Sequence, residues 1–344
     1  MNRLINIHLV ALLLFAAMSC SKDESVRVAP LGEEITFSNA QTRATASTAS
    51  DIGEFGVYAV MSLAPDANYQ QPSDVEYIHI LEDERVYKSG SDYTYTNTAY
   101  WFDQRTFHFF GYWPYGTTSR KATDGVSYEL DFEVAKAATP EAQTAADDLL
   151  TFHYSTAYVQ GNATTVDVNF THILSKVTFS ISQDFTKNPN DRFHVNSVSL
   201  TPIKAGGTYT TSRYNQVGEW HYSNNQLSFS KTFLAIDPEN PQFETDPPGT
   251  NNLVIFDGLK LVPQKIESGT IGLVVKYTYE QGDGNTFNDP VEKTASTFLP
   301  IGEWKPGKAY HYKMTLYQDN LIVFKNIDIT PWGEQPDAGT IIIK

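Results

Sequence analysis

The chain contains 344 residues, with 25 Lys and Arg against 40 Asp and Glu, which gives a formal net charge of −15. A surface of this sign repels phosphate backbones, so the composition argues against nucleic acid as a partner. The single cysteine excludes an intrachain disulfide and a cysteine-based zinc cluster. With 20 Tyr and 20 Phe, the composition favours pleated sheets, whose half-buried surfaces suit aromatic side chains.

Residues 1–19 have the pattern of an export signal. A positive charge at Arg3 precedes the apolar run "LINIHLVALLLFAAMS", which is too short to span a bilayer. The run ends in small residues directly before Cys20, and this arrangement resembles the lipobox of bacterial lipoproteins, with Ala17 where most lipoboxes carry Leu. The resemblance implies that residues 1–19 are a signal peptide and that Cys20 is acylated. The alternative is a plain signal peptide followed by an unrelated cysteine.

Residues 20–46 are predicted to form a tether. The sequence "SKDE" after Cys20 is similar to the acidic segment that sends Bacteroides-type lipoproteins to the cell surface. Two or three acyl chains on Cys20 give durable anchoring, whereas a single chain is marginal. We therefore expect an outer-membrane lipoprotein, held by its lipid anchor and displayed at the cell surface.

Strict alternation of apolar and polar residues marks several short runs along the rest of the chain. In "TIGLVVKYTYE", for example, Leu273 and Val275 share one face, and Lys276 takes the other. The inward positions of three further runs are Val166, Val168 and Phe170; Val177, Phe179 and Ile181; and Tyr310, Tyr312, Met314 and Leu316. Alternation over so many short runs predicts antiparallel strands with one buried face, and hence an all-β protein.

The length of the chain exceeds that of one comfortable sandwich, so we expect two β domains. The proposed domains are residues 47–163 and 164–344, which places Val168 and Phe170 inside the second. Turn signals separate the strands, among them "KAGG" at 204–207 and "QGDGN" at 281–285.

Sequence motifs for catalysis or metal binding are missing. The histidines outside the signal show no spacing typical of metal ligands, and "GDGN" at 282–285 lacks the further oxygen ligands of a calcium loop, so it is interpreted as a hairpin turn. No nucleophile elbow, phosphate-binding loop or dinucleotide fingerprint occurs. We therefore predict a protein that is not an enzyme and that holds no metal and no cofactor.

The tryptophans offer a different kind of site. Trp101, Trp113 or Trp220 could form a stacking platform for sugars, which would make the chain a surface glycan-binding lipoprotein. Alternation of Phe107 and Phe109 in the same region instead favours a domain core.

Four segments, in order, resemble the fimbrillin family of Bacteroidales, the Mfa-like and FimA-like pilins. They are "ITFSNAQTRATASTASDIGEFGVYAVMS", "DDLLTFHYS" with "VDVNFTHILSKVTFSI", "EWKPGKAYHYKMTL" and "IDITPWGE". The resemblance implies two transthyretin-like β-sandwich domains and a structural or adhesive subunit of cell-surface fimbriae (pili). The implied partners are other fimbrillin subunits, together with host or bacterial surface ligands in cell adhesion.

The resemblance also implies proteolytic processing after an arginine, followed by strand exchange between subunits. The matching bond is Arg43–Ala44, and the released segment includes "EEITFS", with Ile35 and Phe37 on one face of a strand. Removing a strand exposes unpaired backbone groups beside an apolar core, which a neighbour's strand can then complete. The alternative is that Arg43 lies in a flexible linker and is never cut.

Residues 334–344, "EQPDAGTIIIK", follow the last family-like segment. Stalk pilins of the family carry a longer extension that supplies the donor strand, and "GTIIIK" is β-branched but short. The segment is therefore compatible with a tip or accessory subunit as well as with a stalk subunit.

Replacing Cys20 tests the predicted lipid anchor. Cys20→Ser should abolish acylation, because serine offers no thiol for the acyl transfer, and should release the protein from the membrane fraction. Palmitate labelling of wild type and variant measures this directly. Label that persists in Cys20→Ser would contradict the prediction.

Overall fold

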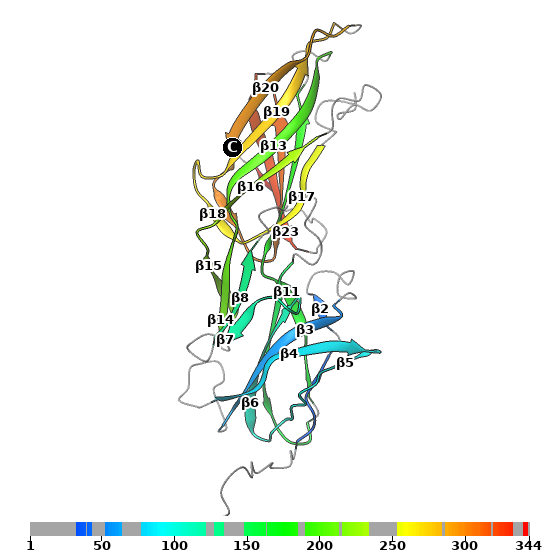
Figure 1. Cartoon of the computed structure of the whole chain (residues 1–344), viewed down its shortest axis with the longest axis vertical. Coiled ribbons are helices and arrows are strands. Elements are labelled where there is room, and N and C mark those ends of the chain that lie inside the picture. Colours follow the sequence, from blue (N-terminus) through cyan, green and yellow to red (C-terminus); the bar gives the residue numbers. More distant parts are fainter. Residues whose placement is uncertain are drawn as a thin grey trace, which may run out of the picture.

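The computed structural model describes most of the chain between residues 32 and 342. The described ranges are 32–38, 40–42, 52–63, 77–121, 127–133, 148–162, 164–184, 190–212, 215–233, 253–283, 286–317, 319–332 and 340–342. These residues form strands and no helix, which confirms the all-β prediction. Figure 1 shows an elongated molecule, with the earlier strands gathered at one end and the later strands at the other.

The first group of strands forms a seven-stranded sheet and a small two-stranded sheet. The larger sheet has the order β2 (Gln41–Thr42), β11 (Asn169–His172), β9 (Leu150–Tyr158), β6 (Arg105–Trp113), β3 (Glu54–Ser62), β4 (Tyr77–Ser89) and β5 (Asp92–Thr94). The smaller sheet pairs β1 (Thr36–Phe37) with β10 (Thr165–Val166). A core rich in aromatic rings, including Phe55, Phe109 and Phe152, packs against these strands.

The second group surrounds a core of its own. One sheet has the order β17 (Leu253–Leu261), β12 (Ser175–Gln183), β22 (Lys308–Leu316), β23 (Ile322–Pro331) and β24 (Thr340–Ile342). A four-stranded sheet has the order β16 (Gln226–Thr232), β13 (Arg192–Lys204), β19 (Gly272–Glu280) and β20 (Val291–Phe298). A two-stranded sheet pairs β18 (Gln264–Ile266) with β21 (Gly302–Trp304). Leu273, Val275 and Leu316 lie in this core, as the alternation predicted.

Val168 and Phe170 are fully buried, but the expectation that they pack inside the second group is wrong. Both belong to the first core. The reason is strand pairing, because β10 pairs with β1, and β11 pairs with β2 and β9. The domain division at residues 163 and 164 itself stays a prediction.

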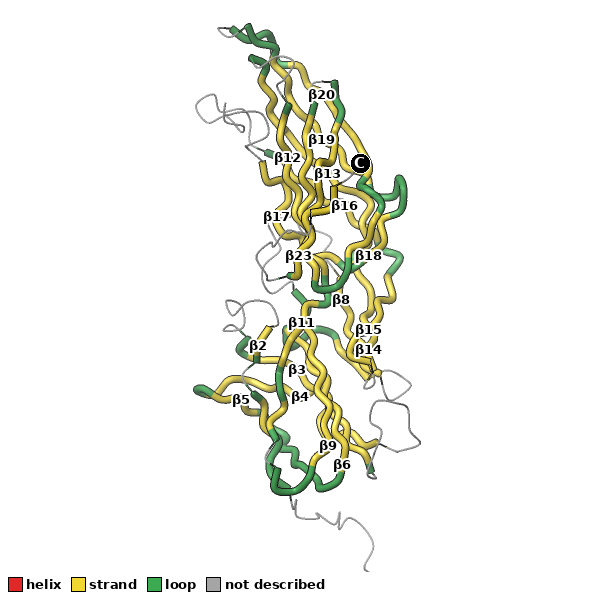
Figure 2. Tube along the Cα trace, turned by 180° about the vertical axis from the view of Figure 1, so that it is seen from behind, coloured by secondary structure: helices red, strands yellow, loops and turns green. Residues whose placement is uncertain are grey.

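A further sheet, the shared sheet, joins strands from the first and second halves of the chain. Its order is β15 (Asn215–Tyr222), β14 (Gly206–Ser212), β8 (Ser127–Glu133) and β7 (Ser119–Lys121), and it lies between the two ends of the molecule (Figure 2). β8 and β14 pair antiparallel along their whole length, from Gly206 opposite Glu133 to Ser212 opposite Ser127. The "KAGG" sequence is the point where the chain leaves β13 and enters this sheet, and Ala205 there is fully buried.

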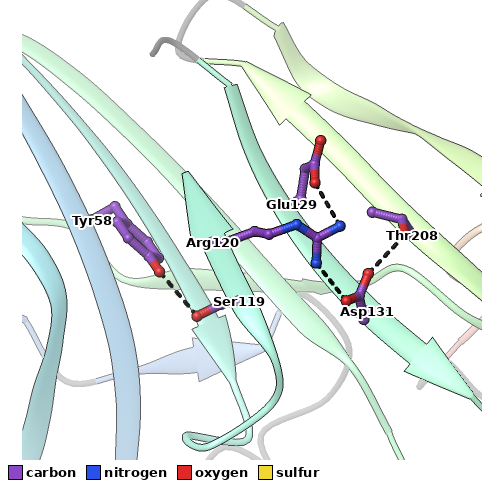
Figure 3. Close-up of polar contacts among 6 residues, drawn as sticks. All are labelled: Tyr58, Ser119, Arg120, Glu129, Asp131 and Thr208. Atoms are coloured by element: carbon purple, nitrogen blue, oxygen red, sulfur yellow. Dashed lines mark hydrogen bonds and ion pairs between the residues drawn. The ribbon is translucent and has the colours of Figure 1, made fainter. Parts of the chain in front are cut away.

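Polar side chains connect the strands of this shared sheet (Figure 3). The Arg120 guanidinium lies 2.7 Å from the Glu129 carboxylate and also pairs with Asp131. The Thr208 hydroxyl donates a hydrogen bond of 2.7 Å to Asp131. Partial burial alone raises the pKa of Asp131, but the hydrogen bonds from Arg120 and Thr208 outweigh burial and lower it. Because Arg120 is half-exposed, these ion pairs fix geometry more than they stabilise the fold.

The apolar face of the shared sheet is buried by packed side chains. It contributes to a third cluster, separate from the two cores, that includes Phe110, Tyr128, Leu130, Tyr209 and Trp332. The rings of Phe110 and Tyr128 stack with centroids 5.1 Å apart, which joins the first group of strands to the shared sheet. The two groups are therefore connected by packed side chains as well as by the backbone.

Truncating Leu130, which is fully buried in β8, tests the contribution of this cluster. Leu130→Ala should lower the free energy of unfolding by about 2–5 kcal/mol, through lost burial and the cavity left behind. The matched control is Leu321→Ala, because Leu321 is 53% exposed and loses little on truncation. Urea denaturation of both variants measures the difference, and equal effects would contradict the role of the cluster.

Candidate functional site

The candidate site is the N-terminal segment, which we define as the described residues between Glu33 and Thr42. Ile35, Phe37 and Ala40 are buried with exposures of 0%, 6% and 5%, whereas Thr36 is exposed. Ile35 lies directly before β1, and Phe37 ends that strand. Period two therefore directs two large apolar side chains of this short segment into the first core.

One side of the segment is paired with residues 99–101. The Ile35 amide donates to the Ala99 carbonyl at 2.9 Å, and the Trp101 amide donates to the Glu33 carbonyl at 2.8 Å. Glu34 forms an antiparallel bridge with Tyr100 between these bonds. This side of the segment is thus hydrogen-bonded like a strand in a sheet.

The opposite side of the segment is paired with residues 165–168. β1 runs parallel to β10, with Phe37 opposite Val166, and the Ser38 amide donates to the Val166 carbonyl at 2.9 Å. Adjacent residues of a strand direct their backbone groups to opposite sides, and the two sets of bonds come from residues of opposite parity. The segment is therefore inserted between two neighbours and does not lie at a free edge.

The side chain of Phe37 occupies an aromatic pocket. Its ring meets Phe55, Tyr95 and Phe109 edge-on, with centroid distances of 5.9, 5.6 and 6.2 Å. Edge-to-face pairs of this kind add about 0.5–1.5 kcal/mol beyond the burial of apolar area. Phe37 is thus the main apolar anchor of the segment.

Tyr95 also fastens the segment through its hydroxyl. The Tyr95 hydroxyl donates to the Ile35 carbonyl at 2.8 Å. Burial raises the pKa of Tyr95 to about 12, so the phenol stays neutral and remains a donor at neutral pH. The hydroxyl therefore adds a side-chain bond to the backbone pairing of the segment.

The remaining residues predicted for this site lie at its boundary or outside the described residues. Cys20, Arg43 and Ala44 fall outside them. The last described residue before Arg43 is Thr42, whose backbone is paired with Phe170 in the parallel pair of β2 and β11. The segment is thus bound to its neighbours up to the residue before the predicted cut.

The triple-isoleucine sequence near the C-terminus is located in the other group of strands. Its first part forms β24, the edge strand of the five-stranded sheet, antiparallel to β23. The sequence predicted β character for this stretch but gave no signal for its partner.

The structure excludes Trp101 from the predicted tryptophan platform. Trp101 is fully buried, and its ring stacks on Tyr158 with centroids 5.3 Å apart, so it cannot stack on a sugar. Trp113 and Trp220 are half-buried, and the Trp220 indole donates to the Ile173 carbonyl at 3.1 Å. Phe107 and Phe109 lie in the first core, which confirms the alternative interpretation.

Metal-binding clusters and membrane-spanning helices are absent from the described part of the chain. No group of three or more His, Cys, Asp or Glu side chains there could hold a metal ion. Within the same residues, no helix is long and apolar enough to cross a membrane.

A family model described as fimbrillin-like matches residues 42–332. The chain therefore belongs to the fimbrillin-like family, which agrees with the resemblance in its sequence motifs. A comparison with curated proteins gives no match.

The chain is similar to solved structures at low sequence identity. A fimbrial protein from Bacteroides vulgatus superposes with a TM-score of 0.64 at 15% identity, over 87% of this chain and 99% of the other. Candidate cell adhesion proteins from Bacteroides ovatus and Bacteroides uniformis have TM-scores of 0.48 and 0.47, each at 14% identity. They cover 88% and 87% of this chain and 98% of each of the two structures. The first of these similarities supports the fold.

Truncating Phe37 tests whether the segment is an integral part of the first core. Phe37→Ala should lower the free energy of unfolding of the uncut protein by about 3–5 kcal/mol. The control on the same strand is Thr36→Ala, whose exposed side chain should change stability by less than about 0.5 kcal/mol. Thermal or urea unfolding of both variants gives the comparison. A Phe37→Ala variant as stable as Thr36→Ala would show that the segment contributes nothing to the core.

Proposed function

We propose that this protein is a structural or adhesive subunit of cell-surface fimbriae that assembles with other fimbrillin subunits by strand exchange. It reaches the outer membrane as a lipoprotein anchored through Cys20, and it has no catalytic role. The observation that carries the proposal is the insertion of the N-terminal segment between residues 99–101 and 165–168, with Ile35 and Phe37 in the core. Membership of the fimbrillin-like family supports it.

Removal of the segment would open a groove with unpaired backbone groups on both walls. The Ala99 carbonyl, the Trp101 amide and the Val166 carbonyl would each lose a hydrogen-bond partner. An unpaired buried polar group costs about 1–3 kcal/mol. The lost burial of Ile35 and Phe37 adds about 1.5–3 kcal/mol for each side chain. An incoming strand that restores both kinds of contact would bind for the same reasons that the segment does.

The proposed cut at Arg43–Ala44 lies directly after the segment. A cut there would disconnect the segment and the Cys20 anchor from the rest of the chain together. The subunit would leave the membrane, and its groove would become open to exchange. The uncut segment therefore suppresses self-association while the protein is being exported.

The two separate cores of the fold support a subunit built from two domains. We propose that the two cores correspond to two transthyretin-like β-sandwich domains, joined by the shared sheet. The glycan-binding alternative loses one of its three candidate tryptophans, because Trp101 is buried.

Limited trypsin treatment of the purified, uncut protein tests this function. The first cut is expected at Arg43, and the cut protein, but not the intact one, should associate with itself or with partner subunits in size-exclusion chromatography. Arg43→Ala should resist both the cut and the association. The matched control is Arg85→Ala, which removes a half-exposed arginine on β4 and should leave both unchanged. Cut protein that stays monomeric even with partner subunits present would refute strand exchange at this site.

A further inference from the structure

The inserted segment shows which side chains its groove accepts. Its buried positions are Ile35, Phe37 and Ala40, so the spacing changes from two residues to three after Phe37. Ser38 occupies the point where the spacing changes. A replacement strand with plain alternation could not match all of these positions in one register.

The change of spacing is coupled to a specific polar contact. The Val168 amide, which lies between β10 and β11, donates to the Ser38 hydroxyl oxygen at 3.0 Å. The same hydroxyl donates to the Asp167 carboxylate at 3.4 Å. Val168 is fully buried, so an apolar side chain in place of Ser38 would leave its amide without this acceptor. The groove therefore requires a short hydroxyl side chain at this position.

The pocket one position earlier is shaped for a ring. Three aromatic neighbours, Phe55, Tyr95 and Phe109, present edges or faces to Phe37. An aliphatic side chain there would lose these ring contacts and leave space that its neighbours fill only in part. The pocket therefore discriminates between aromatic and aliphatic residues.

Residues 334–344 of the chain do not satisfy this pattern in any register. The sequence "EQPDAGTIIIK" contains no aromatic residue, and its only hydroxyl residue, Thr340, follows Gly339. If Ile341 and Ile343 took the positions of Ile35 and Phe37, Lys344 would fall at the Ser38 position. This segment of a second copy is thus a poor occupant of the groove.

We propose that the groove selects a donor strand with an aliphatic residue, an aromatic residue two positions later, Ser or Thr directly after it and a small residue two positions beyond. This strand comes from another fimbrillin subunit and not from residues 334–344 of a second copy. The inference rests on the proposed strand exchange and adds the sequence pattern of the donor strand.

Peptide competition on the purified protein, cut after Arg43, tests the selectivity of the groove for its donor strand. The probe is a fluorescent peptide with the sequence of residues 33–42, and unlabelled peptides compete for its site. Peptides carrying Phe37→Leu or Ser38→Val should each bind about ten-fold or more weakly, equivalent to at least about 1.4 kcal/mol. A Thr36→Val peptide is the control, because Thr36 is exposed, and should bind within about two-fold of the parent. A peptide of residues 334–344 should bind at least about a hundred-fold more weakly than the parent.

The outcomes separate this inference from the proposed function. If the parent peptide binds but the Phe37→Leu, Ser38→Val and 334–344 peptides bind equally well, selectivity is refuted while strand exchange survives. If the 334–344 peptide binds best, the partner is a second copy. If no peptide binds the cut protein, strand exchange at this groove fails, and the inference fails with it.

Discussion

The insertion of a short strand between two distant parts of the chain is the constraint on which the first core depends. Ser38 and Asp167, which face each other across this contact, are 129 residues apart in sequence. Contacts of such separation form late, because the chain must close a long loop before they stabilise anything. The segment thus depends on two parts of the chain, residues 99–101 and 165–168, that are far from it in sequence. Under the proposed strand exchange, a strand of another molecule would meet the same two neighbours.

The shared sheet determines how far the effects of an open groove spread. β8 belongs to the first half of the chain and β14 to the second, and their pairing brings Leu130 and Tyr209 into one cluster. This cluster is distinct from the core that contains Phe37. Loss of the segment therefore removes contacts from one core, while the packing between the two groups of strands keeps its own residues. Under the proposed strand exchange, the packing between the two groups of strands would stay intact.

The sequence predicted which side chains of a strand are buried, but it did not predict which distant strands pair with one another. Alternation identified Leu273, Val275 and Phe170 as buried, because the face that a side chain takes depends only on its strand. It could not assign Phe170 to the correct core, since that depends on pairing with β2 and β9. The pattern of "EEITFS" likewise indicated a strand, but no local signal revealed its two neighbours. The "KAGG" stretch resembled a turn, because a change of sheet and a turn use the same small residues.

The energetics of the groove decide how one strand can replace another. An empty groove would expose the sites of Ile35 and Phe37, at about 1.5–3 kcal/mol each, and each backbone group left unpaired and shielded from water would cost about 1–3 kcal/mol. Two side chains and two such shielded groups amount to about 5–12 kcal/mol, which is comparable to the whole stability of an ordinary domain. A fully vacated groove is therefore a poor intermediate. In the proposed exchange, the incoming strand would therefore pair at one end while the resident segment leaves from the other. The Phe37 pocket would then be the step at which a strand without an aromatic residue stalls, because only a ring restores the contacts that the leaving ring gives up.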